Sequence, residues 1–228
     1  MLRKQKGSTP FIKIDPLHPD PEAVSCAADI IRQGGVVVFP TRNLYGLGTD
    51  ALNPGAVDRI FKIKKRPSSK PLLVLIKSRD ELPKLVRHIP AAAECLMEHF
   101  WPGRLTIILE AKDTLPANLT CGTGKIGVRL PGHPVALSLS AAVDSPISGT
   151  SANISGKPGC SNATELQASI IRKVDCILNA GQLQKGIGST VVDISEMKVE
   201  IIREGSIPVE NIRSVLKALS FNHIDIQG

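Results

Sequence analysis

The stretch VVVFPTRNLYGLGTDALNPGAVDRIFKIKKRPSSKPLLVLI, residues Val36–Ile76, decides the fold of this chain. It opens with an apolar, β-branched run that is typical of a buried strand. A polar loop that contains glycine follows over Thr41–Asp50. Residues 53–64 then place apolar side chains at helical spacing, with Asn53 able to cap the helix and a proline at its first position. A second buried strand over Leu72–Ile76 completes a predicted strand, loop, helix and strand.

A cationic segment joins the predicted helix to the second strand. Arginine offers a planar fork for phosphate oxygens and lysine a mobile point charge, so such a segment suits phosphate. The alternative is a solvated helix end, where cations also interact favourably with the helix dipole. Because runs of cations are common, the charge run alone favours this alternative. The cations of the segment are Lys62, Lys64, Lys65, Arg66 and Lys70.

Length and composition indicate a globular protein. The chain has 228 residues, of which 42% are hydrophobic and 21% charged, which suits one large or two small domains. With only 5 Phe, 1 Tyr and 1 Trp, a nucleic-acid surface built on aromatic stacking is not expected. The net charge of +7 suits an anionic ligand such as a nucleotide or RNA and does not choose between them.

The cysteines and the N-terminus indicate a cytoplasmic protein. Five cysteines without a C-x-x-C pair argue against a zinc ribbon or a disulfide framework and for reduced thiols. The N-terminus lacks the apolar region of a signal peptide. No apolar run reaches the ~18 residues that a membrane span needs.

The rest of the chain continues the alternation of strands and helices. This pattern predicts an α/β fold with one twisted mixed sheet and a single domain. We expect a basic flexible tail over residues 1–12, the domain over 13–220 and a C-terminal tail over 221–228. Further helices are expected at 20–33, 80–86, 91–99, 134–143, 166–173 and 209–219, and further strands at 105–109, 126–130, 146–150, 176–178, 190–194 and 199–203.

Several motif matches fail the test of context. Residues 122–127 fit G-x-G-x-x-G, but a strand follows them and not the helix of a dinucleotide site. The five histidines are scattered, so neither a metal cluster nor a catalytic triad is visible. What remains is a set of polar loops at strand ends, where ligands bind in open α/β sheets. An ordinary turn or cap is the alternative for Ser151 and Asn153.

These loops carry a series of motifs that resembles the YrdC-like family of threonylcarbamoyl-adenylate synthases. The resemblance spans about residues 20 to 207. The motifs are Pro40-Thr41 with Tyr45-Gly46-Leu47, Lys64-Lys65-Arg66-Pro67, Trp101-Pro102-Gly103, Val128-Arg129 with Pro131 and His133-Pro134, Thr150-Ser151-Ala152-Asn153 with Ser155-Gly156, Gly188-Ser189-Thr190-Val191, and Arg203-Glu204-Gly205.

The resemblance implies a single-domain YrdC-like fold with a concave basic cleft and a nucleotidyltransferase activity. In that reaction threonine and bicarbonate form a carbamate, which attacks the α-phosphate of ATP and releases pyrophosphate. The product, threonylcarbamoyl-AMP, serves N6-threonylcarbamoyladenosine (t6A) modification of tRNA through a downstream transferase complex. Mg²⁺ is expected to come with ATP. A non-catalytic module that binds tRNA or double-stranded RNA by shape is an alternative.

The resemblance also assigns residues. The catalytic pair Lys64 and Arg66 is expected against the phosphates with both charges exposed, so that replacing either with alanine stops turnover and leaves the fold intact. The nucleotide is assigned to Arg66, Lys70, Lys125 through its backbone, Ser151, Asn153 and Arg203, and the amino acid to Asn43, Arg129 and Ser189.

Three positions depart from the family pattern at the amino-acid end of the expected site. The first loop reads Thr41-Arg42-Asn43 where synthases usually have Thr-Glu-Thr, Leu75 stands where a histidine is common, and Gly149 replaces a serine. A lost polar contact in such a pocket changes selectivity strongly. A paralogue of the YciO type that adenylates another small substrate is therefore the second hypothesis. Restoring Asn43→Thr with Leu75→His is expected to improve threonine use.

Overall fold

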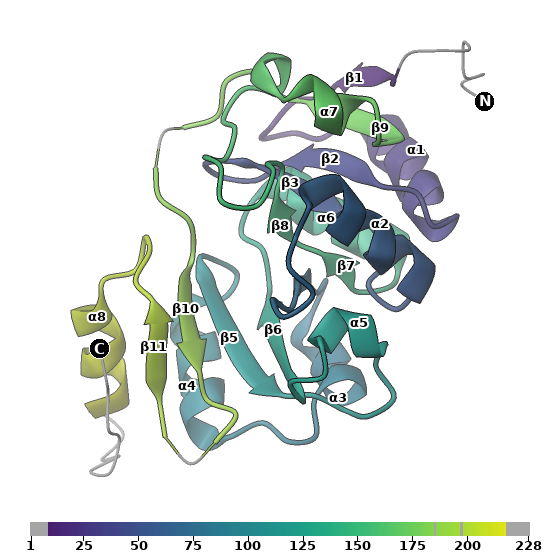
Figure 1. Ribbon diagram of the computed structural model, residues 1–228. Coiled ribbons are helices and arrows are strands. Elements are labelled where there is room, and N and C mark those ends of the chain that lie inside the picture. The colour runs from purple at the N-terminus through teal and green to yellow at the C-terminus, as the bar shows by residue number, and fades with distance from the viewer. Residues whose placement is uncertain (1–8, 185, 197, 218–228) are drawn as a thin grey trace.

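The computed structural model describes residues 9–184, 186–196 and 198–217. It confirms the α/β class, but the strands divide into two mixed sheets where the sequence predicts one (Figure 1). In sheet order, the five-stranded sheet contains β1 (Phe11–Lys13), β9 (Cys176–Asn179), β2 (Val37–Pro40), β3 (Tyr45–Gly48) and β8 (Thr150–Ser151). The six-stranded sheet contains β11 (Glu200–Arg203), β10 (Thr190–Asp193), β5 (Leu105–Glu110), β6 (Lys125–Arg129), β4 (Leu73–Leu75) and β7 (Ile147–Ser148).

The division into two sheets is visible at Gly149. The chain leaves β7, which pairs with β4, and after this single residue enters β8, which pairs with β3. The sequence predicts one continuous strand over 146–150. Gly149 instead carries the chain from one sheet to the other.

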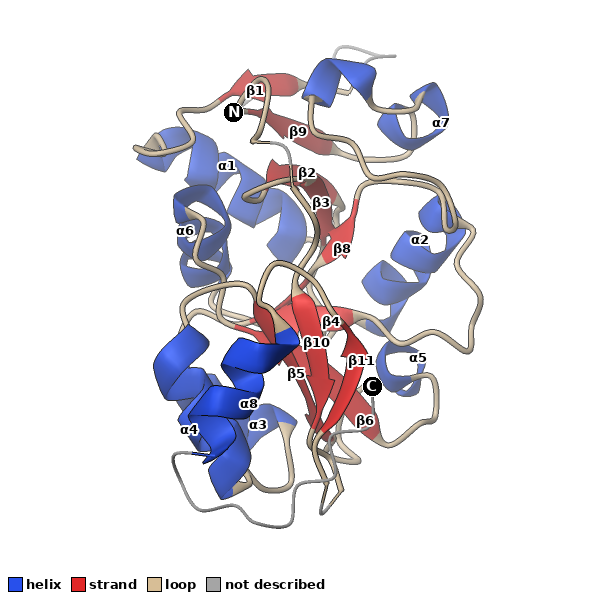
Figure 2. Cartoon of the chain, turned by 90° about the vertical axis from the view of Figure 1, so that its left-hand side faces the viewer, coloured by secondary structure: helices blue, strands red, loops and turns tan. Residues whose placement is uncertain are grey.

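Helices cover both faces of the five-stranded sheet (Figure 2). On one side lie α1 (Pro21–Arg32) and α6 (Pro134–Val143), and on the other α2 (Pro54–Lys64) and the short α7 (Ala168–Ile171). Beside the six-stranded sheet lie α3 (Leu82–Leu85), α4 (Ala91–Phe100), α5 (Ala117–Thr120) and α8 (Val209–Lys217), and two 3-10 turns occupy Arg79–Glu81 and Ala163–Glu165.

The predicted helix of the central unit, α2, forms as the sequence indicates. The Asn53 side chain caps the helix by accepting from the Ala56 backbone N–H at 3.1 Å. The helix ends at Lys65, which adopts the left-handed conformation with φ 48°. The Arg66 backbone N–H then closes the end by donating to the Phe61 carbonyl at 3.0 Å. These caps fix the direction in which the cationic segment leaves the helix.

Three elements lie where the sequence predicts none. Strand β3 forms inside the predicted loop by pairing with β2 on one side and β8 on the other, and its buried Tyr45 donates from the hydroxyl to the Gly181 carbonyl at 2.7 Å. Strand β1 includes Phe11 and Ile12 of the predicted tail, which pair with β9. The third element is α5. Residues 1–8 and 218–228, with the rest of both predicted tails and the end of the last helix, lie outside the described residues.

The six-stranded sheet has two unlike faces. Leu105, Ile107 and Leu109 of β5 are buried in the main core together with Leu96 and Met97 of α4. The alternate residues of the strands point the other way, as strand geometry requires, and that face is open to a cavity. Within the described ranges, no helix combines the length and apolar character needed to cross a bilayer.

Candidate active site

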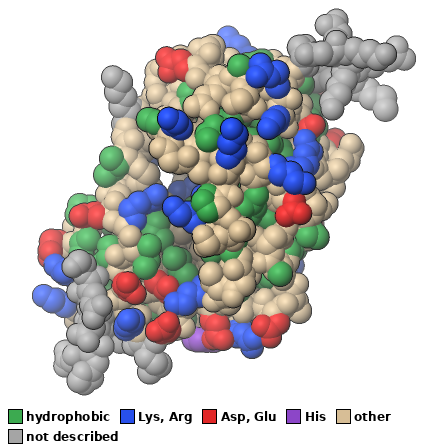
Figure 3. Space-filling model, viewed as in Figure 1, with side chains coloured by type: hydrophobic (Ala, Val, Ile, Leu, Met, Phe, Trp, Pro, Cys, Tyr) green, Lys and Arg blue, Asp and Glu red, His purple; other side chains and the backbone are tan. Residues whose placement is uncertain are grey.

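A cavity of about 900 Å³ lies over the open face of the six-stranded sheet. Its floor is made by alternate residues of three neighbouring strands, and loops of the five-stranded sheet form its opposite wall. Figure 3 shows Lys and Arg side chains gathered at the hollow between the two parts of the molecule. The floor residues are Thr106 and Ile108 of β5, Lys125, Gly127 and Arg129 of β6, and Val191 and Asp193 of β10.

The charged lining of the cavity is strongly cationic. Among the described residues, Asp193 is the only carboxylate that reaches it. An excess of one charge in a cleft with low-dielectric walls concentrates ligands of the opposite sign. The cavity therefore suits a polyanion. Its cationic residues are Arg42, Arg66, Arg104, Lys125, Arg129 and Arg203.

The structure brings seven of the ten predicted site residues to this cavity. Lys64, Lys70 and Asn153 are not part of its lining. The seven that line it are Asn43, Arg66, Lys125, Arg129, Ser151, Ser189 and Arg203.

The sequence predicts an exposed Lys64 side chain, but in the structure this side chain is buried. It is only 1% accessible, and its ammonium donates to the Asn153 carbonyl at 2.8 Å, to the Asn153 Oδ1 at 3.4 Å and to the Ser151 carbonyl. Burial and the charge of Arg66 lower the pKa of Lys64 to about 8. Lys64 thus holds the end of α2 against the segment that follows β8, and its donors are used inside the protein.

The Arg66 guanidinium is held in a fixed orientation at the cavity wall. Its Nε donates to the Lys70 carbonyl at 2.8 Å and its Nη2 to the Pro71 carbonyl at 2.7 Å. Burial lowers the pKa of Arg66. Lys70 itself is exposed and contributes its carbonyl to this arrangement. The basic segment therefore presents one oriented cation to the cavity, and not a mobile group of five.

The segment after β8 carries the predicted Ser151 and Asn153 in different settings. Ser151 lines the cavity and its hydroxyl donates to the Asn153 Oδ1. Asn153 is 8% exposed, and its amide donates to the Ile154 and Lys157 carbonyls at 2.9 and 2.6 Å. Asn153 thus shapes the turn, as the alternative reading expects, and Ser151 faces ligand space.

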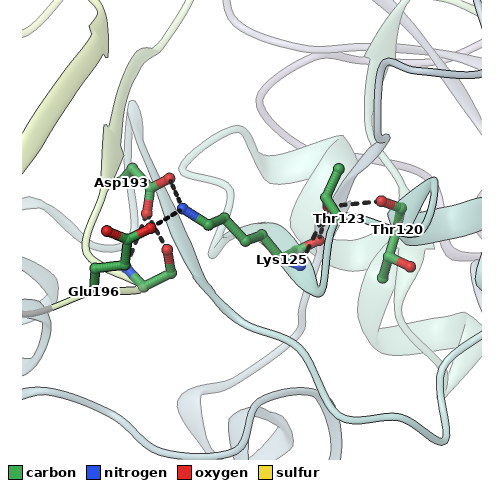
Figure 4. A network of polar contacts seen from close by, with 6 residues as sticks. Thr120, Thr123, Lys125, Asp193 and Glu196 are labelled. Carbon is green, nitrogen blue, oxygen red and sulfur yellow. Dashed lines mark hydrogen bonds and ion pairs between the residues drawn. The ribbon is translucent and has the colours of Figure 1, made fainter.

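Lys125 turns its side chain away from the loop that precedes it (Figure 4). Its ammonium lies 3.1 Å from the Asp193 Oδ2 and 3.1 Å from the Glu196 Oε1. Burial lowers the pKa of Lys125, but the contacts with these two carboxylates outweigh that effect and raise it overall. The backbone N–H of Lys125 donates to the Thr123 hydroxyl at 3.2 Å, so the predicted backbone contact with the nucleotide stays a prediction.

Arg203 and Ser189 form a joined pair at the end of β10 and β11. The Arg203 guanidinium donates to the Ser189 carbonyl through Nη2 at 2.7 Å and Nε at 3.2 Å. The Ser189 hydroxyl lies 3.0 Å from the Thr106 hydroxyl on the cavity floor. Arg129 lies on the neighbouring β6, where burial and the charge of Arg203 lower its pKa to about 10. Its buried Nε has no hydrogen-bond partner among the described residues.

The three departures from the family pattern have different surroundings. Asn43 lines the cavity and donates from Nδ2 to the Gln184 carbonyl at 3.1 Å. Gly149 also lines it, but Leu75 does not, and Leu75 is fully buried. A Cβ at position 149 would lie 2.7 Å from the Leu75 Cγ. The placement of Leu75 in the amino-acid pocket is therefore wrong: this side chain packs beneath Gly149.

The cavity lining also includes residues that the sequence did not assign, among them Arg42, Arg104 and His133. Burial and the charge of Arg42 lower the pKa of His133 to about 4, and the same two causes lower the pKa of Arg104. Arg42 lies in the polar loop after the first strand, so its position after a strand end could have identified it. Nothing local distinguishes Arg104 from a surface arginine.

Comparison with known proteins identifies relatives of this chain. The model of the Sua5, YciO and YrdC family, described as "Telomere recombination", matches residues 29–205. A threonylcarbamoyl-AMP synthase of Pyrococcus abyssi is 40% identical over 193 residues, which are 85% of this chain and 57% of that protein. The chain thus spans less than two thirds of the length of this relative.

Solved structures agree with the sequence relatives. A crystal structure of P. abyssi Sua5 complexed with L-threonine has a TM-score of 0.87 at 36% identity, covering 96% of this chain and 66% of that one. The structure of Escherichia coli YciO has a TM-score of 0.82 at 29% identity, covering 90% of this chain and 99% of that one.

Proposed function

We propose that this chain, which belongs to the Sua5, YciO and YrdC family, is an L-threonylcarbamoyladenylate synthase, an ATP-dependent nucleotidyltransferase. One observation carries the proposal. Arginines from three separate segments, Arg66, Arg129 and Arg203, line the same cavity as Ser151 and Ser189. This arrangement provides cations for a triphosphate and for a carboxylate in one cavity.

The reaction needs positioning and charge neutralisation more than a covalent nucleophile. The threonine amine attacks bicarbonate, a C–N bond forms and water leaves, giving a carbamate. A carbamate oxygen then forms a bond to the α-phosphorus of ATP, the bond to the β-phosphate oxygen breaks, and pyrophosphate departs. Arg66 and Arg203 neutralise the phosphates, and Arg129 pairs with the threonine carboxylate while Asn43 and Ser189 hold the amino acid.

Lys64 has a supporting role in this proposal. Its ammonium is engaged by the carbonyls of Ser151 and Asn153, so it positions the segment that presents Ser151 to the nucleotide. Lys125 contributes its backbone, because its side chain is paired with Asp193 and Glu196.

Magnesium enters with the nucleotide in this proposal. Among the described residues no group of three or more His, Cys, Asp or Glu side chains could hold a metal ion. Asp193, the carboxylate at the cavity, already accepts from Lys125 and from the Ser195 backbone N–H at 2.8 Å. The residues present do not form a cage, so the phosphates of ATP would supply the ligands that fix Mg²⁺.

The proposed product determines the proposed partners. Threonylcarbamoyl-AMP would be passed to a transferase complex that modifies tRNA in the cytoplasm. Binding of tRNA or double-stranded RNA by this chain stays a prediction. Low aromatic content favours recognition by shape over base stacking.

The test is pyrophosphate release from ATP, Mg²⁺ and bicarbonate, with each amino acid added singly. We expect release that depends on both bicarbonate and threonine. Release with another amino acid would replace threonine and favour the YciO-type hypothesis, which Asn43 and Gly149 at the cavity motivate. ATP binding without turnover on any amino acid would overturn the synthase proposal.

A further inference from the structure

The loop between α2 and β4 contains a tight turn that exposes two serines. The Lys70 backbone N–H donates to the Pro67 carbonyl at 3.1 Å, which places Ser68 and Ser69 at the two central positions of a four-residue turn. All four residues are exposed. Among the described residues, no group forms a hydrogen bond with either serine hydroxyl. Both hydroxyls are therefore accessible and free to react.

The sequence around this turn is basic and contains no acid. Residues 62–70 include five cations and neither Asp nor Glu. Arg66 and Lys65 lie two and three residues before Ser68, whereas Ser69 has a cation at only one of these two distances. A protein kinase whose substrate groove is acidic selects serines that follow basic residues at these distances, through charge complementarity. Of the two serines, Ser68 has the better charge pattern for such a kinase.

The Arg66 side chain joins the end of the same turn to the cavity. Its guanidinium donates to the Lys70 carbonyl at 2.8 Å and to the Pro71 carbonyl at 2.7 Å, and both Arg66 and Pro71 line the cavity. These bonds use two of the five N–H donors that a guanidinium carries. Within the described ranges no carboxylate forms an ion pair with Arg66. An anion attached to this turn would therefore find free donors on the arginine that faces the cavity.

We propose that Ser68 is a phosphorylation site and that its phosphate lowers the affinity for ATP by pairing with Arg66. The Ser68 Oγ forms a bond to the γ-phosphorus of ATP held by the kinase, the bond from that phosphorus to the bridging oxygen breaks, ADP leaves, and the hydroxyl proton passes to a base of the kinase. The phosphoserine carries about −1.5 to −2 charges at pH 7 and three acceptor oxygens. It engages the free donors of Arg66 and repels a triphosphate in the cavity. The effect on ATP rests on the proposed function, whereas the modification itself does not.

The first measurement is phosphorylation of the folded protein. Wild type, Ser68→Ala and Ser69→Ala are incubated with ATP, Mg²⁺ and the catalytic subunit of the cAMP-dependent protein kinase, which is the probe for recognition of basic residues. Mass spectrometry of the peptides locates the phosphate. We expect a phosphate on Ser68 in the wild type and in Ser69→Ala, and none in Ser68→Ala. An unmodified wild type, or equal labelling of Ser68→Ala, would overturn the assignment.

The second measurement tests the pairing with Arg66 in the absence of nucleotide. The second pKa of the phosphoserine is followed by ³¹P NMR, and it should fall at least about half a unit below its ordinary value of about 6, because an adjacent cation stabilises the dianion. The reference is the phosphorylated peptide of residues 60–72, which carries the same cations without the fold that orients Arg66. Equal pKa values in the protein and the peptide would contradict the pairing.

The third measurement is equilibrium binding of ATP with Mg²⁺ and without an amino acid. Phosphorylation of Ser68 should raise the Kd for ATP about tenfold, and Ser68→Asp, with one charge, about threefold. The control is Ser25→Asp, which adds the same charge at an exposed position of α1 and should leave the Kd unchanged. An unchanged Kd after complete phosphorylation would overturn the effect on ATP. If the unmodified protein binds no ATP, the proposed function fails, and the first two measurements still decide whether Ser68 is modified and pairs with Arg66.

Discussion

The Lys64 ammonium donates to the backbone carbonyl of Asn153 at 2.8 Å, although the two residues are 89 positions apart in the chain. The contact joins the end of α2 to the segment after β8 and closes one corner of the cavity. A lysine ammonium that donates to buried backbone carbonyls stabilises the fold. The neighbouring Arg66 also donates to backbone carbonyls, those of Lys70 and Pro71, but unlike Lys64 it lines the cavity.

This difference predicts separate phenotypes for the two residues. Lys64→Met removes the lysine donor from the Asn153 carbonyl and one of two donors from the Ser151 carbonyl, so we expect the free energy of unfolding to fall by about 1–3 kcal/mol. Arg66→Gln removes the guanidinium that donates to the Lys70 and Pro71 carbonyls, so we expect a loss of about 0.5–1.5 kcal/mol, together with loss of pyrophosphate release at ordinary ATP concentrations. Urea denaturation and ATP titration distinguish the two. Equal stability of Lys64→Met and wild type would contradict the structural role.

A second prediction concerns Gly149 and Leu75. An alanine Cβ at position 149 would lie 2.7 Å from the Leu75 Cγ and 2.8 Å from the Leu73 Cδ1, so Gly149→Ala should cost about 1–3 kcal/mol through overpacking. Leu75→Ala alone should cost about 2–5 kcal/mol because it leaves a cavity in the core. In the double variant the losses should be smaller than their sum, since each change relieves the other. Additive losses in thermal and urea unfolding would refute the contact.

The same geometry changes the expectation for restoring the family pattern. Leu75 is fully buried in the cluster that includes Val135 and Leu139 of α6. A histidine there would place a polar ring among apolar side chains. We therefore expect Asn43→Thr with Leu75→His to lose stability before it gains any threonine affinity, and Asn43→Thr alone to be the informative variant. Threonine titration of both variants, each with its melting temperature, checks this.

Local signals in the sequence were sufficient for most of the fold. The N-cap of α2 at Asn53 and the end of the helix before Pro67 follow from residue types that act within one turn. The left-handed conformation of Lys65 does not, because glycine or asparagine is usual there. Strand β3 was not predictable in the same way, because one of its two pairing partners, β8, lies far away in the sequence. Division of the strands at Gly149 likewise depends on which partner each side of the glycine meets.

In the candidate site too, the sequence does not predict features that depend on contacts between distant segments. Motif order was enough to name residues that converge on one cavity, such as Arg66 and Arg203. It did not separate Lys64, whose charge is buried against carbonyls, from a lysine that reaches ligand. Residue type and spacing do not encode burial by a segment 89 positions away. Arg104 was missed for the same reason, since the turn that presents it packs on another turn.

A third prediction tests the side chain of Lys125. Its ammonium masks the Asp193 carboxylate at the cavity floor. Lys125→Met should expose that negative charge to the triphosphate and raise the KM for ATP roughly fivefold, about 1 kcal/mol of repulsion. Lys125→Met combined with Asp193→Asn should restore the wild-type value, because the carboxylate that lines the cavity is then neutral and Glu196 is not part of the lining. If the double variant binds ATP as weakly as the single one, the lysine contacts the nucleotide directly.

The last prediction is the pH dependence that His133 contributes to stability. Burial and the charge of Arg42 lower its pKa in the folded protein to about 4, from an ordinary value of 6.5. Between these two values the unfolded chain binds the proton and the folded protein does not, so stability rises with pH across this window and is lost as pH falls toward 4. His133→Gln should remove this contribution to the dependence of the free energy of unfolding on pH. The control is His18→Gln, because His18 is exposed. Urea unfolding of the three proteins at pH 4.5, 5.5 and 6.5 measures it, and parallel curves for His133→Gln and wild type would show that His133 does not titrate in this way.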